Sequence, residues 1–149
     1  MDKKQLSKIL ANADRQDVAA LSAKIRETYR PVIIKEPGKT LTMIKMREPV
    51  RQSLFYIGEV IVSEAVVEIE GIKGVAVTMG DDTEKALGIA IIDAAHSSGV
   101  FTGMDTLLAL EKKQNERVMR ENAMHLKTMV NFKSMDQEAP DDLAANKKA

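Results

Sequence analysis

An alternation of side chains over residues 59–70 constrains the fold of this chain more than any other feature. One face of this stretch is apolar with a single small polar exception and consists of Ile61, Ser63, Ala65, Val67 and Ile69. The other face carries Glu64, Glu68 and Glu70. A period of two predicts a β-strand with one face toward water. The segment Gly71-Ile72-Lys73-Gly74 then predicts a turn, and residues 75–79 predict a returning strand, so this region is expected to form an antiparallel hairpin.

Two further strands are expected before this hairpin. Residues 32–34 are β-branched and precede Pro37-Gly38, which is a strong turn signal. Residues 41–46 form the second probable strand. Together with the hairpin, these segments predict an antiparallel sheet of about four strands.

Helical spacing of apolar residues surrounds the predicted sheet. Residues 3–12 and a stretch ending at Glu27 predict an N-terminal helical hairpin, with Asp14 as the cap of its second helix. After Gly80 the period changes, and a helix over residues 84–97 is expected, with Asp81 as its cap. Gly88 lies inside this helix, where glycine costs about 1 kcal/mol against alanine, and therefore suggests close backbone packing.

A long final helix is expected from a cap at Asp105 to about Phe132. Its middle, residues 111–117, contains no apolar side chain, so it is either solvated on all sides or faces a partner. The predicted fold is α+β: an N-terminal helical hairpin, the antiparallel sheet and two C-terminal helices, of which the last is long. We expect one domain over residues 1–135 and a polar, disordered tail over residues 136–149.

Composition excludes several chemistries. The chain contains no cysteine, so disulfides, thiolate metal sites, a cysteine nucleophile and iron–sulfur ligation are excluded. The 22 basic residues balance the 22 acidic ones, whereas general nucleic-acid binders carry a basic excess. The N-terminal residues lack the apolar stretch of a secretory signal, and no apolar run approaches the roughly 18 residues of a membrane span. We therefore expect a cytoplasmic protein without nucleic-acid or membrane partners.

Three local groups of residues are candidate sites. Gly80-Asp81-Asp82 stands at a strand-to-helix junction, where ordinary capping and a Mg²⁺ site through one of the aspartates are both possible. Asp93 and His96 lie three apart on a helix but have no further metal ligand nearby in sequence. The basic cluster Lys45, Arg47 and Arg51 fits either a solvated strand face or contact with a polyphosphate or acidic partner. No catalytic constellation emerges, which favours a subunit or adaptor, inactive alone, over a free-standing enzyme.

Several short segments occur in an order and spacing that resemble one protein family. They are Leu54-Phe55-Tyr56-Ile57-Gly58-Glu59, Val62 to Val67, Gly74-Val75, Gly80-Asp81-Asp82, Lys85-Ala86, Ile91-Ile92-Asp93-Ala94, and the alternating Thr128, Val130, Phe132 and Ser134. This combination resembles the PhnG family, the G subunit of the bacterial phosphonate carbon–phosphorus lyase system, over most of residues 5–135. The chain departs from the family pattern at Lys45, Glu64 and Asp81, where the family usually has arginine.

The resemblance implies membership of a multi-subunit complex. Family members act with the H, I and L subunits in forming α-D-ribose 1-methylphosphonate 5-triphosphate from ATP and methylphosphonate, and the product passes to the J subunit. The G subunit would then be a structural accessory that binds no cofactor itself, with ATP as the substrate of the complex. The positions expected to contact substrate or partner are Lys45, Arg47, Gly58, Glu59, Gly80, Asp82, Thr128 and Phe132.

The sequence is compatible with two modes of association. The chain is a subunit of that transferase complex, or it is a diverged homodimeric ligand-binding or protein-interaction module without enzymatic activity. In either case the final helix is expected to carry part of the contact, since Val118, His125, Met129 and Phe132 recur at helical steps around one side. Neither catalytic residues nor metal ligands are predicted in this chain.

Overall fold

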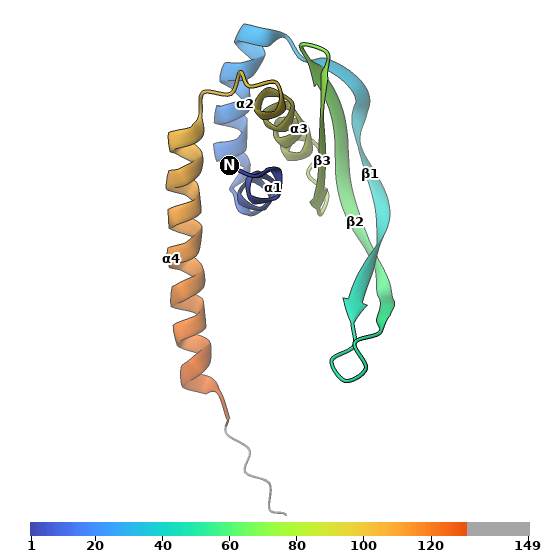
Figure 1. The fold of residues 1–149 in the computed structure, drawn as a ribbon, viewed down its shortest axis with the longest axis vertical. Helices are drawn as coiled ribbons and strands as arrows, with labels where there is room; N and C mark the ends of the chain where they lie inside the picture. Colours follow the sequence, from blue (N-terminus) through green and yellow to red (C-terminus); the bar gives the residue numbers. More distant parts are fainter. Residues whose placement is uncertain (131–149) are drawn as a thin grey trace, which may run out of the picture. The chain divides into compact units, whose positions relative to one another are not determined.

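The computed structural model describes residues 1–130 and has an α+β fold (Figure 1). Its elements in chain order are α1 (Lys3–Asn12), α2 (Arg15–Tyr29), β1 (Val32–Arg47), β2 (Leu54–Ile69), β3 (Ile72–Met79), α3 (Thr83–Ser97) and α4 (Met104–Thr128). The expected N-terminal helical hairpin and two C-terminal helices, the last one long, are confirmed. Contacts divide the chain into a first unit of residues 1–117 and a second unit that begins at Val118.

The antiparallel sheet has the order β1-β2-β3, so within residues 1–130 it contains three strands where about four were expected. The difference arises at Pro37-Gly38, which does not form a turn but lies inside the continuous strand β1. β1 is an edge strand, where a proline without an N–H group does not interrupt a ladder on both sides. Register shifts at Ile33/Lys35 and Lys35/Gly38 absorb the irregularity, so both predicted segments belong to one strand.

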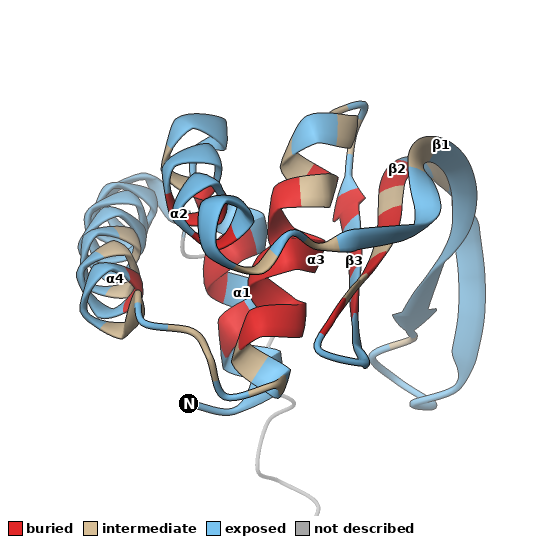
Figure 2. Cartoon of the chain, turned by 90° about the horizontal axis from the view of Figure 1, so that it is seen from above, coloured by how far each residue is buried: buried red, intermediate tan, exposed pale blue. Residues whose placement is uncertain are grey.

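Helix α3 forms the centre of the first unit. It packs against β2 and β3 on one side and against α1 and α2 on the other (Figure 1). Figure 2 shows the buried residues concentrated on α3 and on the surfaces that face it. Ala65, Val67 and Ile69 are buried, as the alternation predicts, whereas Ile61 on the same face is half exposed.

Two glycines allow the layers of the first unit to approach closely. A Cβ atom on Gly74 of β3 would lie 2.1 Å from the carbonyl oxygen of Ala90 and 2.4 Å from the amide nitrogen of Ala94, both on α3. A Cβ atom on Gly88 of α3 would lie 2.8 Å from Cγ1 of Val18 on α2. The close packing expected at Gly88 is therefore confirmed, and Gly74 has the corresponding role on the opposite side of α3.

The helix ends differ in part from the sequence expectations. The N-cap of α3 is Asp82, whose side chain accepts a hydrogen bond from the Lys85 amide at 3.0 Å, so the prediction of Asp81 as the cap was wrong. Asp14 occupies the N-cap position of α2, but its side chain makes no capping hydrogen bond. Asp105 lies in the first turn of α4 rather than at its cap, because α4 begins at Met104. α4 ends at Thr128, before the expected limit near Phe132.

The polar middle of α4 faces α1 in part. Gln114 Nε2 donates to the carbonyl oxygen of Ile9 at 2.9 Å, and Gln5 Nε2 donates to Glu111 Oε1 at 2.7 Å. Upstream of this stretch, Leu107 is fully buried in the core. The absence of apolar side chains over residues 111–117 therefore reflects a polar contact with α1 on one side of the helix and solvent on the other. The predicted tail over residues 136–149 lies outside the described residues.

Candidate functional site

A two-stranded extension of the sheet, here called the β-arm (residues 41–61), is an exposed structured part of the first unit. β1 and β2 remain paired from Gly38↔Glu64 outward to Arg47↔Leu54. β3, in contrast, pairs with β2 only between Val62 and Ile69. Figure 1 shows β1 and β2 continuing together well past the end of β3. The β-arm therefore lies beyond the strand and helix that cover the rest of the sheet.

Both faces of the β-arm are apolar and exposed. Because side chains alternate along a strand, Leu41, Met43 and the paired Ile61 share the face that continues the α3-covered side of the sheet. Their side chains are exposed by 60%, 54% and 50%. The opposite face presents Ile44, Met46 and Phe55, which are also exposed. A register shift at Ile44/Lys45 leaves Ile57 as an additional residue in β2. A two-stranded ribbon is at best marginally stable in water without a covering layer, so these faces suit a partner.

The tip of the β-arm is basic. Lys45 and Arg47 lie two residues apart on β1, so they share a face as the sequence predicts. Lys45 Nζ lies 5.9 Å from the centroid of the Tyr56 ring, which pairs with it across the strands. Arg47 Nη1 donates to the Gln52 carbonyl oxygen at 2.7 Å and thereby braces the tip loop. Within residues 1–130, neither these two cations nor Arg51 forms an ion pair with a carboxylate.

The root of the β-arm is tied to the start of α3 through one buried hydroxyl. Ser63 Oγ donates to the Gly80 carbonyl oxygen at 2.9 Å and accepts from the Asp82 amide at 2.9 Å. The Gly80 amide in turn donates to the Ile61 carbonyl oxygen at 2.9 Å. Gly80 adopts a φ of +97°, a conformation that favours glycine. The junction of Gly80 and Asp82 is thus held by hydrogen bonds within the chain, which supports its interpretation as a helix cap.

Charges around this junction are also matched within the chain. Arg15 forms an ion pair with Glu84 and lies 3.7 Å from Asp82 Oδ1 through its Nε atom. The hydrogen bond with Glu84, followed by the charge of Asp82, raises the pKa of Arg15 above its ordinary value. Lys39 Nζ contacts Asp81 Oδ2 at 2.9 Å. An anionic ligand placed here would therefore compete with carboxylates that already occupy the available cations.

The structure gives partners to all three positions at which the chain lacks the arginines of the PhnG resemblance. Glu64 pairs with Lys35 across β1 and β2, and Asp81 pairs with Lys39 of β1. Lys45 lies over the Tyr56 ring. Two of the departures thus place an acid beside a lysine of β1, which stabilises the edge of the sheet through exposed or half-buried ion pairs.

The predicted contact residues fall into separate places. Lys45, Arg47, Gly58 and Glu59 all belong to the β-arm, where Met43 pairs with Glu59 and Ile44 pairs with Gly58. Gly80 and Asp82 lie at the root of the β-arm. Thr128 is the last residue of α4 and belongs to the second unit, where its hydroxyl donates to the His125 carbonyl oxygen at 3.0 Å.

The remaining predicted contacts lie near or beyond the end of the described chain. Phe132 lies outside the described residues. Within the second unit, Val118 and Met129 have exposed side chains, so they are available for the partner contact that the helical pattern predicts.

Asp93 has a structural role that its pairing with His96 in the sequence did not reveal. Its Oδ2 atom accepts from the Val75 amide at 3.0 Å and lies 3.0 Å from Lys3 Nζ. The side chain is only 3% exposed, and Oδ1 has no hydrogen-bond partner. Asp93 thereby joins α3, β3 and α1. A charged residue within the apolar run 86–95 of α3 was the available signal.

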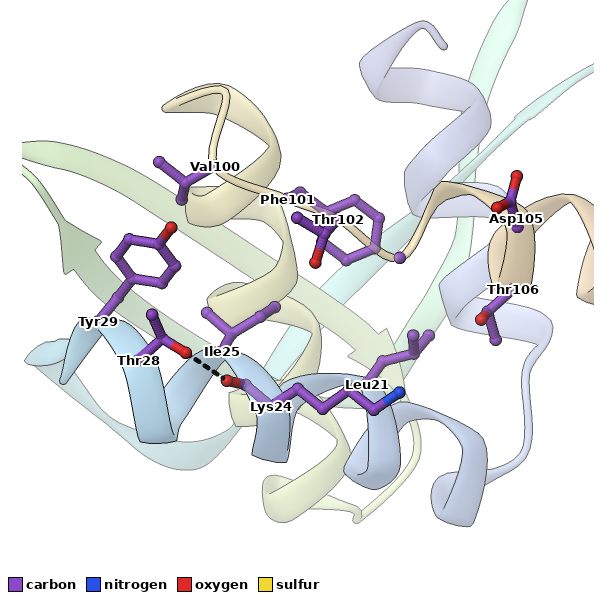
Figure 3. Close-up of a pocket in the computed structure, with 11 residues that line it drawn as sticks. Leu21, Lys24, Ile25, Thr28, Tyr29, Val100, Phe101, Thr102, Asp105 and Thr106 are labelled. Atoms are coloured by element: carbon purple, nitrogen blue, oxygen red, sulfur yellow. Dashed lines mark hydrogen bonds between the residues drawn. The ribbon is translucent and has the colours of Figure 1, made fainter.

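A separate cavity of about 320 Å³ lies between α2 and the loop that joins α3 to α4 (Figure 3). It is lined by Leu21, Lys24, Ile25, Thr28, Tyr29, Val100, Phe101, Thr102, Gly103, Asp105 and Thr106. Figure 3 shows the Tyr29 and Phe101 rings above an α2 floor that includes Ile25 and Lys24. Thr28 Oγ1 donates to the Lys24 carbonyl oxygen at 3.2 Å. None of the predicted contact residues lines this cavity.

Several serine and threonine hydroxyl groups in residues 1–130 form structural hydrogen bonds. Each serine or threonine hydroxyl that donates a hydrogen bond there does so to a backbone carbonyl oxygen, as Ser22 does to Ala19 and Ser98 to Ala94. The same residues contain no group of three histidine or carboxylate side chains arranged to hold a metal ion. The most prominent surface of the first unit is the exposed apolar and basic surface of the β-arm.

Comparison with known proteins identifies the family. A search of curated proteins found no match. No helix within residues 1–130 is long and apolar enough to cross a membrane. The model of the family described as "Phosphonate metabolism protein PhnG" matches residues 1–137. That match includes the whole β-arm, the junction at its root and α4, and it confirms the resemblance found in the sequence. The chain therefore belongs to the PhnG family of phosphonate metabolism proteins.

Proposed function

We propose that this chain is an accessory subunit of the carbon–phosphorus lyase complex in phosphonate catabolism. In this role it acts with the H, I and L subunits, which form α-D-ribose 1-methylphosphonate 5-triphosphate from ATP and methylphosphonate, and the product passes to the J subunit. The chain contributes shape and contact surface rather than reacting groups, and it is inactive alone. Its compartment is the cytoplasm, where ATP is available. Family membership supports the place in phosphonate metabolism.

The observation that carries this proposal is the β-arm. It presents exposed apolar side chains on both faces, and the rest of the first unit, residues 1–117, provides no layer that covers them. Exposed apolar surface of this kind marks a protein–protein contact when it is contiguous and rimmed by polar groups. Lys45 and Arg47 provide such a polar rim at the tip, and their charge suits carboxylates of a partner or phosphate groups of the shared substrate.

A homodimeric interaction module without enzymatic role is the second candidate. The same exposed faces favour it, because a second copy could cover them as well as a different subunit. The two candidates differ in the species formed in solution. A homodimer forms from the isolated chain, whereas an accessory subunit needs the I subunit to reach its final assembly.

Co-expression with the cognate I subunit, followed by sizing and mass determination, tests the proposal. We expect a stable complex that contains both chains. ³¹P NMR of ATP and methylphosphonate with the pure chain should show no turnover, and turnover should require the other subunits. A well-folded monomer that does not bind the I subunit at micromolar concentration would contradict the proposal. Genes for the H, I, J and L subunits beside the gene for this chain would support it.

A further inference from the structure

One edge of β2 carries no strand in the described part of the chain. β3 ends at Met79, opposite Val62, so residues 54–61 pair with β1 on one side only. The open edge spans these eight residues, about 26 Å of strand, and at its inner end the Ile61 carbonyl oxygen already accepts from the Gly80 amide. Its position continues the line of β3, so an added strand would extend the existing sheet toward the tip of the β-arm.

The edge of β1 and the open edge of β2 differ in how they resist strand addition. β1 contains Pro37, register shifts and the lysines Lys35, Lys39 and Lys45, which are the usual devices that prevent another strand from pairing with an edge. Residues 54–61 of β2 contain no proline and no lysine, and Glu59 is their only charged residue. Along residues 54–61 of β2 the bulge at Ile57 is the only device of this kind, so this edge is less protected than the edge of β1.

We propose that residues 54–61 of β2 accept a strand from a different protein, which completes the sheet alongside the β-arm. The added strand has apolar side chains at alternate positions, because both faces of the β-arm are apolar. A carboxylate near the tip is expected in this partner, since Lys45, Arg47 and Arg51 lack acidic partners within residues 1–130. The inference rests on the proposed function in one respect, namely that the strand belongs to the I subunit.

A second copy of the chain fits this edge less well. In antiparallel pairing along the whole edge, Leu54 of the second copy would lie opposite Ile61 of the first. Its tip loop, residues 48–53, would then continue into the place that Met79 and Gly80 occupy beside β2. A strand that ends at this point avoids the collision. The geometry therefore favours a partner that offers a free strand end or a strand followed by a turn away from β3.

Glu59 allows a direct test of backbone pairing. The Ile61 carbonyl oxygen accepts from Gly80, so Ile61 directs its backbone groups away from β1. Glu59, two residues earlier, directs its N–H group to the same side. Glu59→Pro therefore removes a donor from the open edge without removing a hydrogen bond to β1. The matched control, Glu59→Thr, removes the same side chain and charge but keeps the N–H group.

The experiment uses the full chain and the I subunit. Affinity is measured for the wild type and both variants, and thermal unfolding confirms that both variants fold. We expect Glu59→Pro to bind at least tenfold more weakly than Glu59→Thr. Hydrogen–deuterium exchange should slow at residues 54–61 when the complex forms.

Each alternative occupant gives a different result. Equal affinities of the two variants, or unchanged exchange at residues 54–61 in a complex that does form, would overturn the inference and leave the proposed function intact. Failure of the wild type to bind the I subunit would overturn both. Slow exchange at these residues in the isolated, dilute chain would show that the chain covers its own edge. Slow exchange that appears only with self-association would identify a second copy, and either result overturns the inference.

Discussion

The contact between β3 and α3 predicts a large destabilisation from one added methyl group. In the Gly74→Ala variant, the new Cβ would lie 2.1 Å from the Ala90 carbonyl oxygen, where ordinary contact begins at 3.4 Å. The deficit of about 1.3 Å cannot be relieved by a side-chain rotation, because the opposing atoms belong to the backbone. α3 must therefore move away from β3 or the variant must remain strained.

The magnitude follows from two contributions. Overpacking a well-packed core costs about 1–3 kcal/mol. Movement of α3 also separates Asp93 Oδ2 from the Val75 amide, now 3.0 Å apart, and leaves a buried donor without its acceptor at a further cost of about 1–3 kcal/mol. We expect a loss of about 2–6 kcal/mol in the free energy of unfolding, a large share of the roughly 5–15 kcal/mol of a typical domain.

Equilibrium urea unfolding, followed by far-UV circular dichroism, measures this loss. Gly58→Ala is the matched control, since a Cβ atom at Gly58 meets nothing within 4 Å. This control should change stability by less than about 1 kcal/mol. A Gly74→Ala variant that unfolds at the same urea concentration as Gly58→Ala, with the same slope, would refute the packing argument. The second substitution Ala94→Gly should restore little, because the Ala90 carbonyl oxygen remains in place.

Three further perturbations address the core, the root of the β-arm and its tip. Asp93→Ala should lower the free energy of unfolding by about 1–3 kcal/mol, because it leaves the Val75 amide without its acceptor. Lys3→Ala should lower it by at most about 1 kcal/mol, because the Lys3 side chain is 56% exposed. Urea titrations that rank the two variants in the opposite order would contradict this account. Ser63→Ala should cost about 1–3 kcal/mol and speed amide exchange at Asp82, and unchanged exchange there would argue against the role of the hydroxyl. The double variant Lys45→Ala with Arg47→Ala should slow association with the I subunit several-fold at low salt without changing the melting temperature; rates that are independent of salt would count against a charged contact.

The sheet shows what the sequence could and could not predict. The alternation over residues 59–70 correctly predicted that Ala65, Val67 and Ile69 are buried, because a one-sided sheet imposes a period of two. The turn expected at Pro37-Gly38 was wrong, since only tertiary context shows that β1 is an edge strand that tolerates proline. The length of the β-arm was likewise hidden, because its apolar side chains on both faces obscure the alternation.

The sequence identified several residues of the candidate site, but it did not reveal which contacts their side chains make. Lys45 and Arg47 were expected on one face and lie on one face, since their spacing of two residues decides this on any strand. The choice between Asp81 and Asp82 as the helix cap depended on where α3 begins, a boundary that local patterns fix only approximately. Asp93 and Ser63 act across elements distant in sequence, so no local pattern assigns their partners.

The hydroxyl of Ser63 couples the base of the β-arm to the start of α3. By joining β2 to Gly80 and to the amide of Asp82, it links the base of the ribbon to the first turn of the helix on which the whole core is built. We therefore expect a displacement of the β-arm to move the start of α3 with it, rather than to be accommodated in the segment between β3 and α3. Ligation of the distant tip should for this reason slow the opening of the core itself, so that assembly of a complex and resistance of the subunit to unfolding rise together.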